Sequence, residues 1–313
     1  MNTDLRVRLG GLELPNPVVT AAGCAGSGRE LAPFFDIAGI GAVTTKSVML
    51  QPHAGRPAPR MAETPSGMLS TTGMQGPGVD VFLQRDLPWL LSRGGRAIVS
   101  IAGSGTAEFG ELARRISEEQ GVSAIEVNLS CPDPADPGGR RFVDDTARAA
   151  AVVSTVRSHA RSDLPVLAKL AVDVPDVVAL AEACTEARAD GLSMINTVRG
   201  MAVDRRTLRP AVAGGVGGLS GPAIRPLAVG CVYRVHEALP EVPIIGMGGV
   251  RTGADVVEFM AAGASAVAVG TINFSDPSAC ARVLREFTEE LETEGVSRAG
   301  DLVGAAHRPG TGV

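Results

Sequence analysis

The stretch PVLAKLAVDVPDVVALAEACTEARADGLSMIN, residues 165–196, contains one full period of the pattern that decides the fold. The short apolar runs Val166–Leu170 and Leu192–Asn196 are typical of buried strands. The amphipathic stretch Val177–Ala187 lies between them and predicts a helix. A strand, a helix and a second strand in this order indicate an α/β fold with a parallel sheet.

The same alternation continues over the rest of the chain. Further strands are expected at Val18–Ala21, Ala42–Thr45, Ala97–Ile101, Ile125–Leu129, Pro243–Gly246 and Ala266–Val269. Further helices are expected at Phe109–Glu119, Asp144–His159, Ala254–Ala262 and Ser278–Glu292. Eight βα units in 313 residues predict a (β/α)8 TIM barrel rather than a doubly wound sheet.

The segments outside these units indicate where the site lies. Leu5–Leu14 predicts a hairpin that turns at Gly10-Gly11 and closes the bottom of the barrel. Long loops follow strands 2, 4 and 6, at Lys46–Gly78, Ser130–Val143 and Thr197–Pro222. Barrel enzymes build their active sites from loops at this end. We expect one domain over residues 1–313, with a flexible tail from about residue 297.

The composition excludes several classes of protein. The chain is 45% hydrophobic and 20% charged with a net charge of -5, so we expect neither nucleic acid nor a membrane as a partner. No apolar run has the length of a signal peptide core or a membrane span. The five cysteines are scattered without a C-x-x-C pair, and the four histidines show no metal-ligand spacing. We therefore expect no metal and no disulfide framework, and a cytoplasmic location.

Two glycine-rich turns predict a phosphate site. Gly246-Met247-Gly248-Gly249-Val250 follows strand 7, and Val269-Gly270-Thr271 ends strand 8. Backbone N–H groups that glycine leaves accessible bind anions, and barrels often bind phosphate with these two loops. The alternative is a pair of plain tight turns. A Rossmann site is excluded because G-x-G-x-x-G is absent.

Lysine is rare in this chain. Of the 29 basic residues only Lys46 and Lys169 are lysines, and the other 27 are arginines. Lys169 lies inside an apolar strand near its end, and Lys46 directly follows another strand, so both fall on the rim of the predicted active site. An ammonium suits a point contact with developing negative charge, or Schiff-base chemistry, better than a guanidinium does. Codon bias is the alternative explanation.

A third candidate cluster lies in the segment Glu126–Asp133. Cys131 opens a long loop at a strand end, where a thiol can act as a nucleophile or proton acceptor. Asn128 and Asn196 end strands 4 and 6, so their amides could bind one planar ligand together. Taken alone, Cys131 would be interpreted as a packing residue, which is our interpretation of Cys24, Cys184, Cys231 and Cys280.

Together these residues resemble the dihydroorotate dehydrogenase family, specifically its cysteine-containing class 1, and are most similar to the catalytic subunit of the NAD-linked type B. The matching motifs are Leu14-Pro15-Asn16-Pro17, Thr45-Lys46-Ser47, Pro59-Arg60, Glu63-Thr64-Pro65, Asn128-Leu129-Ser130-Cys131-Pro132, Lys169-Leu170, Asn196-Thr197, Gly218–Ile224, Gly246-Met247-Gly248-Gly249 and Val269-Gly270-Thr271. The resemblance implies a TIM barrel that binds FMN at its mouth and oxidises dihydroorotate to orotate in pyrimidine biosynthesis.

The resemblance also implies roles for single residues. The phosphate and ribityl chain of FMN would contact Gly221, Gly248, Gly249, Gly270 and Thr271. The isoalloxazine would be surrounded by Ala22, Gly23, Lys46, Ser47, Asn128 and Lys169. Lys169 would stabilise the negative charge of reduced FMN. Hydride would pass to flavin N5 and a proton to Cys131, with activity rising at mildly alkaline pH because a free thiol has a pKa of about 8.5.

The implied substrate site contains Lys46, Ser70, Asn128, Asp133, Asn196 and Thr197. Several of its positions depart from the usual family motifs. Ser70 and Asp133 stand where the family has asparagine, Gly76 replaces another asparagine, and Ala54-Gly55 replaces Gly-Asn. An ionised carboxylate only accepts hydrogen bonds and would repel a substrate carboxylate. A paralogue that acts on another dihydropyrimidine, or on a related ring or enone, is therefore an alternative.

The resemblance leaves the electron acceptor open between two class 1 types. One type forms homodimers that use fumarate, and the other passes electrons through an iron–sulfur, FAD-containing partner to NAD. Gly218–Ile224 resembles the second type, and we expect a homodimer of this chain in either case. Two further functions remain as alternatives, a phosphosugar aldolase or isomerase with Lys169 as a Schiff-base amine, and a non-catalytic binding barrel.

Overall fold

The fold is an eight-stranded parallel barrel. The computed structural model describes residues 3–131 and 140–308. The barrel strands are β3 (Val18–Thr20), β4 (Val43–Thr44), β7 (Ala97–Ile101), β8 (Val122–Asn128), β9 (Val166–Leu170), β10 (Gly191–Met194), β15 (Ile244–Met247) and β16 (Ala266–Val269). They pair in the order β3-β16-β15-β10-β9-β8-β7-β4. The predicted TIM barrel is confirmed, and each predicted barrel strand is found, with three residues or fewer of difference at its ends.

The barrel closes at a short seam between β3 and β4. Val19 and Ala42 form an isolated parallel bridge, and the Thr20 N–H donates to the Ala42 carbonyl at 3.1 Å. The Thr20 hydroxyl extends the seam, since it accepts from the Thr44 N–H at 2.9 Å and donates to the Thr44 carbonyl at 3.2 Å. Gly41 allows the two segments to approach, because a Cβ there would lie 2.5 Å from the Asn16 carbonyl oxygen.

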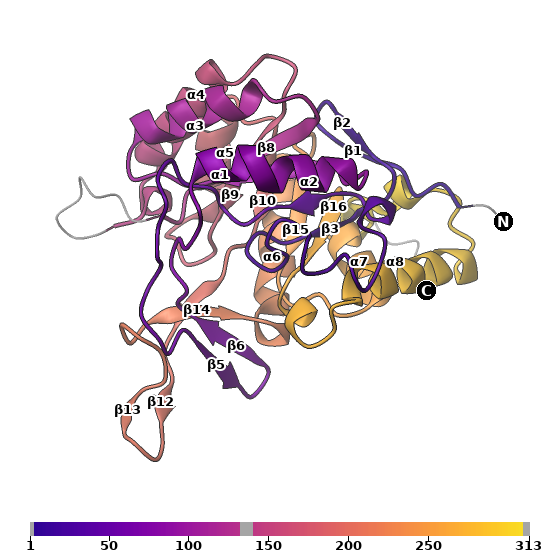
Figure 1. The fold of residues 1–313 in the computed structure, drawn as a ribbon. Coiled ribbons are helices and arrows are strands. Elements are labelled where there is room, and N and C mark those ends of the chain that lie inside the picture. Colours follow the sequence, from indigo (N-terminus) through magenta and orange to yellow (C-terminus); the bar gives the residue numbers. More distant parts are fainter. Residues whose placement is uncertain (1–2, 132–139, 309–313) are drawn as a thin grey trace.

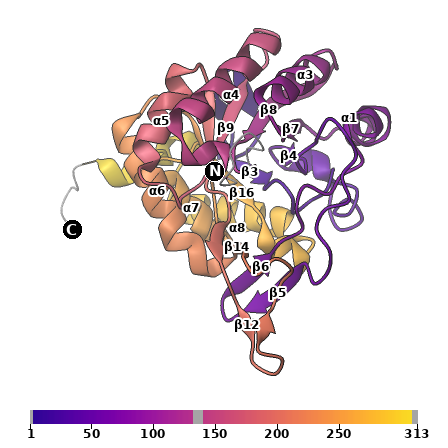
Figure 2. The same ribbon diagram turned by 90° about the vertical axis from the view of Figure 1, so that its left-hand side faces the viewer.

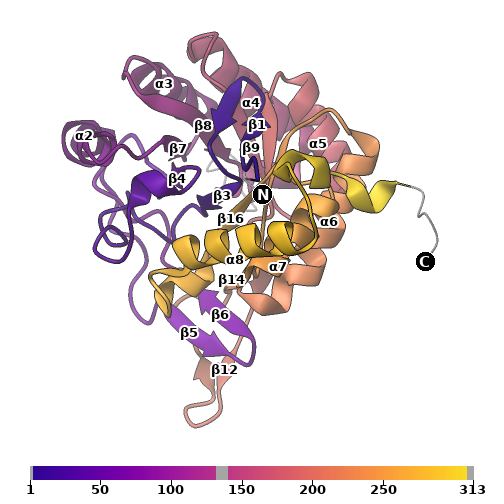
Figure 3. The same cartoon turned by 90° about the vertical axis from the view of Figure 1, so that its right-hand side faces the viewer.

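Helices surround the barrel on its outside (Figures 1 and 3). They are α1 (Val79–Val81), α2 (Leu87–Ser92), α3 (Thr106–Ser117), α4 (Thr146–His159), α5 (Val177–Glu186), α6 (Arg225–Ala238), α7 (Gly253–Ala261) and α8 (Ala279–Thr293). The five helices that the sequence predicts are all present, and the structure adds α1, α2 and α6. Within the described ranges, no helix is long and apolar enough to cross a bilayer.

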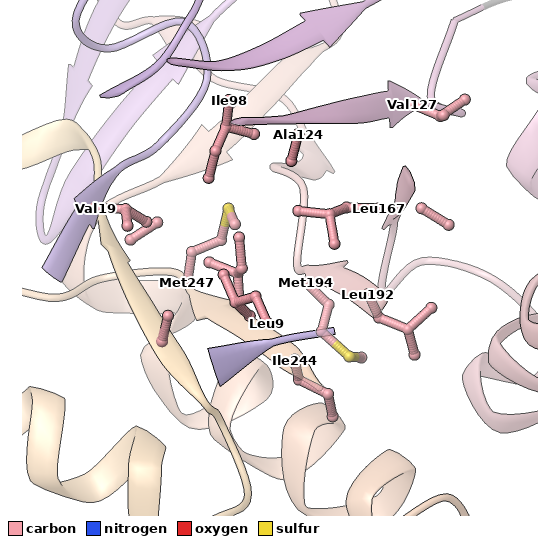
Figure 4. Packing of buried hydrophobic residues seen from close by; sticks show 14 of the residues in the cluster. Leu9, Val19, Ile98, Ala124, Val127, Leu167, Leu192, Met194, Ile244 and Met247 are labelled. Atoms are coloured by element: carbon pink, nitrogen blue, oxygen red, sulfur yellow. The ribbon is translucent and has the colours of Figure 1, made fainter. Parts of the chain in front are cut away.

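The N-terminal hairpin closes one end of the barrel, as predicted. It consists of β1 (Val7–Leu9) and β2 (Leu12–Leu14), which are paired antiparallel. Figure 4 shows the Leu9 side chain among those of Met194, Ile244 and Met247, and Leu9 is fully buried. Gly10 has a left-handed φ of 57°, which glycine adopts without strain. The hairpin therefore completes the apolar core at the N-terminal ends of the strands.

Two of the expected long loops contain a second sheet. Its strands are β5 (Met61–Thr64), β6 (Gly67–Ser70), β11 (Val198–Gly200) and β14 (Gly217–Ser220), in the antiparallel order β11-β14-β6-β5. A small hairpin of β12 (Val203–Asp204) and β13 (Arg209–Pro210) projects beyond it (Figures 1 and 2). Glycine permits the close pairing, because a Cβ at Gly67 would collide with the Ser220 carbonyl. The sheet joins the loops after β4 and β10 beside the barrel mouth.

The described part of the tail that was expected to be flexible from about residue 297 has local structure, and its flexibility stays a prediction. Residues 297–308 contain 3₁₀ turns at Ala299–Leu302 and Ala305–His307. Arg298 forms a bridge with Asp4, and the His307 ring stacks on Tyr233 with 3.9 Å between ring centroids. These contacts bury Ala299 fully, so this segment packs against the barrel. Residues 309–313 lie outside the described residues.

The seam yields a test of the fold. We expect Gly41→Ala to lower the free energy of unfolding by about 1–3 kcal/mol, because its Cβ would press on two backbone oxygens that cannot move aside. Gly39→Ala is the matched control, since no atom lies within 4 Å of a Cβ there. We expect it to change stability by less than about 0.5 kcal/mol. Urea unfolding followed by circular dichroism measures both, and equal effects would contradict the importance of the seam.

Candidate active site

A cavity of about 310 Å³ lies at the C-terminal ends of the barrel strands. Residues that directly follow or end a strand form most of its wall, and the second sheet contributes Met61, Met68 and Ser70. The wall thus consists of the strand ends of the barrel and of the second sheet, which the loops after β4 and β10 form. Such an arrangement is typical of barrel enzymes, whose chemistry lies at this face.

The cavity brings together the predicted site residues that the structure describes, with one exception. It is lined by Ala22, Gly23, Lys46, Ser47, Ser70, Asn128, Lys169, Asn196, Thr197, Gly221, Gly248, Gly249, Gly270 and Thr271. Cys131 is described but does not line the cavity. Asp133 lies outside the described residues, so the structure gives no account of it.

One end of the cavity is built from glycine. Gly221, Gly248 and Gly249 have φ values of 93°, 132° and 76°, in the region that favours glycine. A second cavity of about 300 Å³ adjoins this end and shares Gly221, Gly249 and Thr271 with the first. A Cβ at Gly249 would lie 2.8 Å from the Gly221 carbonyl oxygen. The loop after β15 can therefore approach the Gly221 backbone this closely because residue 249 has no side chain.

The same loops present free hydrogen-bond donors. Within residues 3–131 and 140–308, the backbone N–H groups of Gly248, Gly249, Val250 and Gly270 donate no hydrogen bond. Backbone donors that face a cavity are well suited to bind a phosphate. This donor set fits a phosphate group such as the one carried by the FMN that the sequence resemblance implies.

Polar side chains form a connected row along the cavity wall. The Asn196 amide donates to the Asn128 side-chain oxygen at 3.4 Å, and the Asn128 amide donates to the Ser47 hydroxyl at 3.1 Å. Ser47 in turn bonds to the Ser100 hydroxyl at 2.9 Å. The Asn128 side-chain oxygen also accepts from the Ser130 N–H at 3.2 Å. These bonds fix the relative orientation of the Asn128 side chain at the end of β8 and the Asn196 side chain after β10.

The two lysines have different environments. Lys169 is 4% exposed and lies 3.4 Å from the buried Glu126 carboxylate, while Lys46 makes no ion pair in the described part of the chain. Burial lowers the pKa of Lys46, and the nearby Cys24 thiol opposes this shift. Lys169 also contacts the Met247 sulfur at 2.8 Å. The cavity wall therefore carries one paired and one unpaired ammonium group.

Cys131 lies behind the wall. Its side chain is 2% exposed, and its thiol donates to the Asn128 carbonyl at 3.3 Å. Burial raises the pKa of the Cys131 thiol to about 12, against a smaller opposing effect of nearby backbone N–H groups. This pKa lies above the ordinary thiol value of about 8.5 from which the sequence-based expectation of rising activity at mildly alkaline pH started.

Sequence reasoning assigned no role to several polar residues of the site, among them Glu126, Cys24 and Ser193. Glu126 and Cys24 line the cavity, although Cys24 was interpreted as a packing residue. Ser193 lies behind Glu126 and donates to its carboxylate at 2.6 Å. A charged residue inside an apolar strand was the available signal for Glu126, because a buried lysine needs an anion nearby. Within the described residues, no group of three His, Cys, Asp or Glu side chains is placed to hold a metal.

Comparison with known proteins gives consistent matches over almost the whole chain. The profile of the dihydroorotate dehydrogenase family matches residues 4–291. A relative from Desulforudis audaxviator is 46% identical over 310 residues, which cover 99% of this chain and 100% of the relative. A relative from Anoxybacillus flavithermus is 45% identical, covering 98% and 97%. Both relatives are named dihydroorotate dehydrogenase B (NAD(+)), catalytic subunit.

The glycine loops yield a test of the phosphate site. We expect Gly249→Ala to weaken FMN binding to the apoprotein at least about tenfold, because the added Cβ strains a left-handed residue and narrows the loop contact. Binding of riboflavin, which lacks the phosphate, should weaken less. Quenching of flavin fluorescence measures both affinities.

Gly300→Ala is the control for this test, since no atom lies within 4 Å of a Cβ at Gly300. It should leave both affinities unchanged. Equal weakening of FMN and riboflavin binding by Gly249→Ala would show that this loop does not hold the phosphate.

Proposed function

The chain belongs to the dihydroorotate dehydrogenase family, and from this premise we propose that it is the catalytic subunit of an FMN-dependent enzyme that oxidises dihydroorotate to orotate in pyrimidine biosynthesis. The observation that carries the proposal is the single cavity in which two lysines, two asparagines and the glycine loops converge. These are the groups that a flavin and a planar amide-containing ring require. Family membership adds the reaction class, an oxidation of a CH–CH bond.

FMN supplies the chemistry of hydride acceptance when it is bound. On this proposal the backbone donors of Gly248, Gly249 and Gly270 hold the phosphate, with Gly221 and Thr271 at the ribityl chain. Ala22, Gly23, Ser47 and Asn128 contact the ring. The ammonium groups of Lys46 and Lys169 supply positive charge to the same cavity, where they favour the build-up of negative charge during the reaction.

The substrate would lie against the row of amides. Asn128 and Asn196 each keep one amide N–H outside the bonds described above, and the Asn196 side-chain oxygen keeps one lone pair beside its bond from the Thr197 N–H. These groups match the C=O and N–H groups of a pyrimidine ring. Their mutual hydrogen bond and the Ser47 contact fix their orientation before substrate arrives. Lys46, Ser70 and Thr197 complete the proposed substrate contacts. A preorganised row of this kind lowers the entropy cost of orienting the reacting carbon atoms.

We propose Cys131 as the base that takes the substrate proton. Its position three residues after Asn128, at the start of the loop after β8, supports this role. Because its thiol pKa is about 12 in the present arrangement, only a small fraction is thiolate at neutral pH. The rate of proton abstraction should therefore rise with pH over the whole range in which the protein remains folded.

One observation favours a second candidate function. Ser70 lines the cavity from β6, at a position where the family has asparagine. Its hydroxyl is shorter than an asparagine amide, which offers both a donor and an acceptor and reaches further into the cavity. A dihydropyrimidine without the carboxylate of dihydroorotate is thus the second candidate substrate. Parallel assays with dihydroorotate and dihydrouracil separate the two. The match to the family over residues 4–291 leaves no observation that favours a phosphosugar aldolase.

The proposed assembly contains a second protein. The named relatives are catalytic subunits, and we infer that this chain likewise works with an electron-transfer subunit that carries an iron–sulfur cluster and FAD. Within the described residues no metal-binding group of side chains is found, so the partner would supply the cluster. We also propose a homodimer of this chain in the complex. The five free cysteines support a reducing, cytoplasmic location.

The role of Cys131 yields a kinetic test. We expect Cys131→Ser to slow the anaerobic reduction of bound flavin by dihydroorotate about 10²–10⁴-fold, because a hydroxyl is a far weaker acid than a thiol at the same position. In the wild type the rate should rise roughly tenfold per pH unit below the thiol pKa. Stopped-flow absorbance measures both.

Cys184→Ala is the matched control, because Cys184 is equally buried in α5 and its thiol pKa is also raised to about 12. It should leave the rate unchanged. A pH-independent wild-type rate, or normal turnover in Cys131→Ser, would contradict the proposed base.

The partner subunit yields a separate test. We expect the isolated chain to reduce no NAD⁺ in the presence of dihydroorotate, and the complex with an iron–sulfur flavoprotein subunit to reduce it in steady turnover. NADH absorbance measures the reaction. Fumarate-dependent turnover by the isolated chain, with no gain from the partner, would instead support the homodimeric type.

A further inference from the structure

A buried carboxylate lies next to Lys169 in the centre of the barrel. Glu126 on β8 is 1% exposed, and its Oε2 atom lies 3.4 Å from the Lys169 Nζ atom on β9. The same oxygen accepts a hydrogen bond of 2.6 Å from the Ser193 hydroxyl on β10. Three adjacent strands thus place a carboxylate, an ammonium and a hydroxyl in direct contact.

The carboxylate faces the cavity as well as its partners. Glu126 and Lys169 both line the cavity wall, and the second oxygen, Oε1, is buried and makes no hydrogen bond within the described residues. Among the described residues that line the cavity, Glu126 is the one carboxylate, against the two ammonium groups of Lys46 and Lys169. Its negative charge therefore cancels about half of the positive charge on the wall.

Stability alone does not account for this arrangement. Burial of two charges is costly, and a well-packed apolar pair of similar volume is often equally stable or more so. Most of the side chains around the pair on β8, β9 and β10 are apolar and buried, so an apolar pair would fit the barrel. The Glu126 carboxylate is retained on the cavity wall although its burial is costly. This indicates that its charge affects the molecule that binds in the cavity.

We propose that Glu126 is a positioning residue that sets the reduction potential of the bound flavin. It holds the Lys169 ammonium against the cavity wall and limits the net positive charge that the flavin experiences. This inference rests on the proposed function, since it requires FMN in the cavity. The balance of charge then decides how readily the flavin accepts electrons from the substrate and passes them on.

The direction of the effect follows from the charges. Reduced FMN carries more negative charge than oxidised FMN, so positive charge on the wall favours the reduced form. Removal of the Glu126 charge leaves two ammonium groups unopposed and should raise the flavin midpoint potential. Removal of the Ser193 hydroxyl has the opposite effect, because the carboxylate then keeps its full negative charge without a hydrogen-bond donor.

The experiment compares midpoint potentials of the FMN-loaded protein by equilibration with a redox dye. Glu126→Gln keeps the shape of the side chain and removes its charge. We expect it to favour binding of reduced over oxidised FMN by at least about tenfold, which corresponds to a rise of about 30 mV for a two-electron couple. We expect Ser193→Ala to lower the potential.

Shifts of opposite sign in the two variants would support the proposal. Shifts of the same sign, or no shift in either variant, would overturn it, because a purely structural pair has no reason to move the potential in opposite directions. If Glu126→Gln does not fold, the midpoint potential of Ser193→Ala alone tests the proposal. An unchanged or raised flavin potential in Ser193→Ala would then overturn it. A wild-type protein that binds no FMN would refute the proposed function itself, which is a distinguishable result.

Discussion

The closure of the barrel between β3 and β4 is the constraint on which the rest of the structure depends. The seam is short, and it relies on one backbone bridge, the Thr20 hydroxyl and the absence of a side chain at Gly41. Closure makes all eight strand ends converge on one mouth. Residues as distant in sequence as Gly23 and Thr271 then line the same cavity. Without the seam, β3 and β4 would be the edges of an open sheet, and the two lysines and the glycine loops would not be held around one space.

Within this frame, the site combines two kinds of local chemistry. The glycine loops after β15 and β16 leave backbone donors unpaired, which suits an anion. The strand ends of β8, β9 and β10 carry the charged and amide groups, held by the bonds that Ser193 donates to Glu126 and that Asn128 donates to Ser47. The second sheet, formed by the loops after β4 and β10, adds Ser70 to the wall. An extended flavin nucleotide and a small ring beside it require both kinds of group.

Much of this could be predicted from the sequence, and the failures have physical causes. Strands such as β7, β9 and β16 were predicted with their observed bounds, because strands buried on both faces are continuous apolar runs. The second sheet was missed because its strands are short, rich in glycine and paired over about 150 residues, as Ser220 is with Met68. Glu126 was missed as the partner of Lys169 because that contact depends on which strands adjoin. Cys131 was expected in the site, and the cavity is lined without it.

We propose that a single cavity holds the flavin ring at the lysine and asparagine residues and the phosphate at the glycine loops. A crystal structure of the protein with FMN and orotate tests it most directly. We predict the phosphate within hydrogen-bond distance of the N–H groups of Gly249 and Gly270, and the flavin ring in contact with Lys46 and Lys169. Electron density for FMN at any other place, or a reversed orientation with the ring at the glycine loops, would contradict the account.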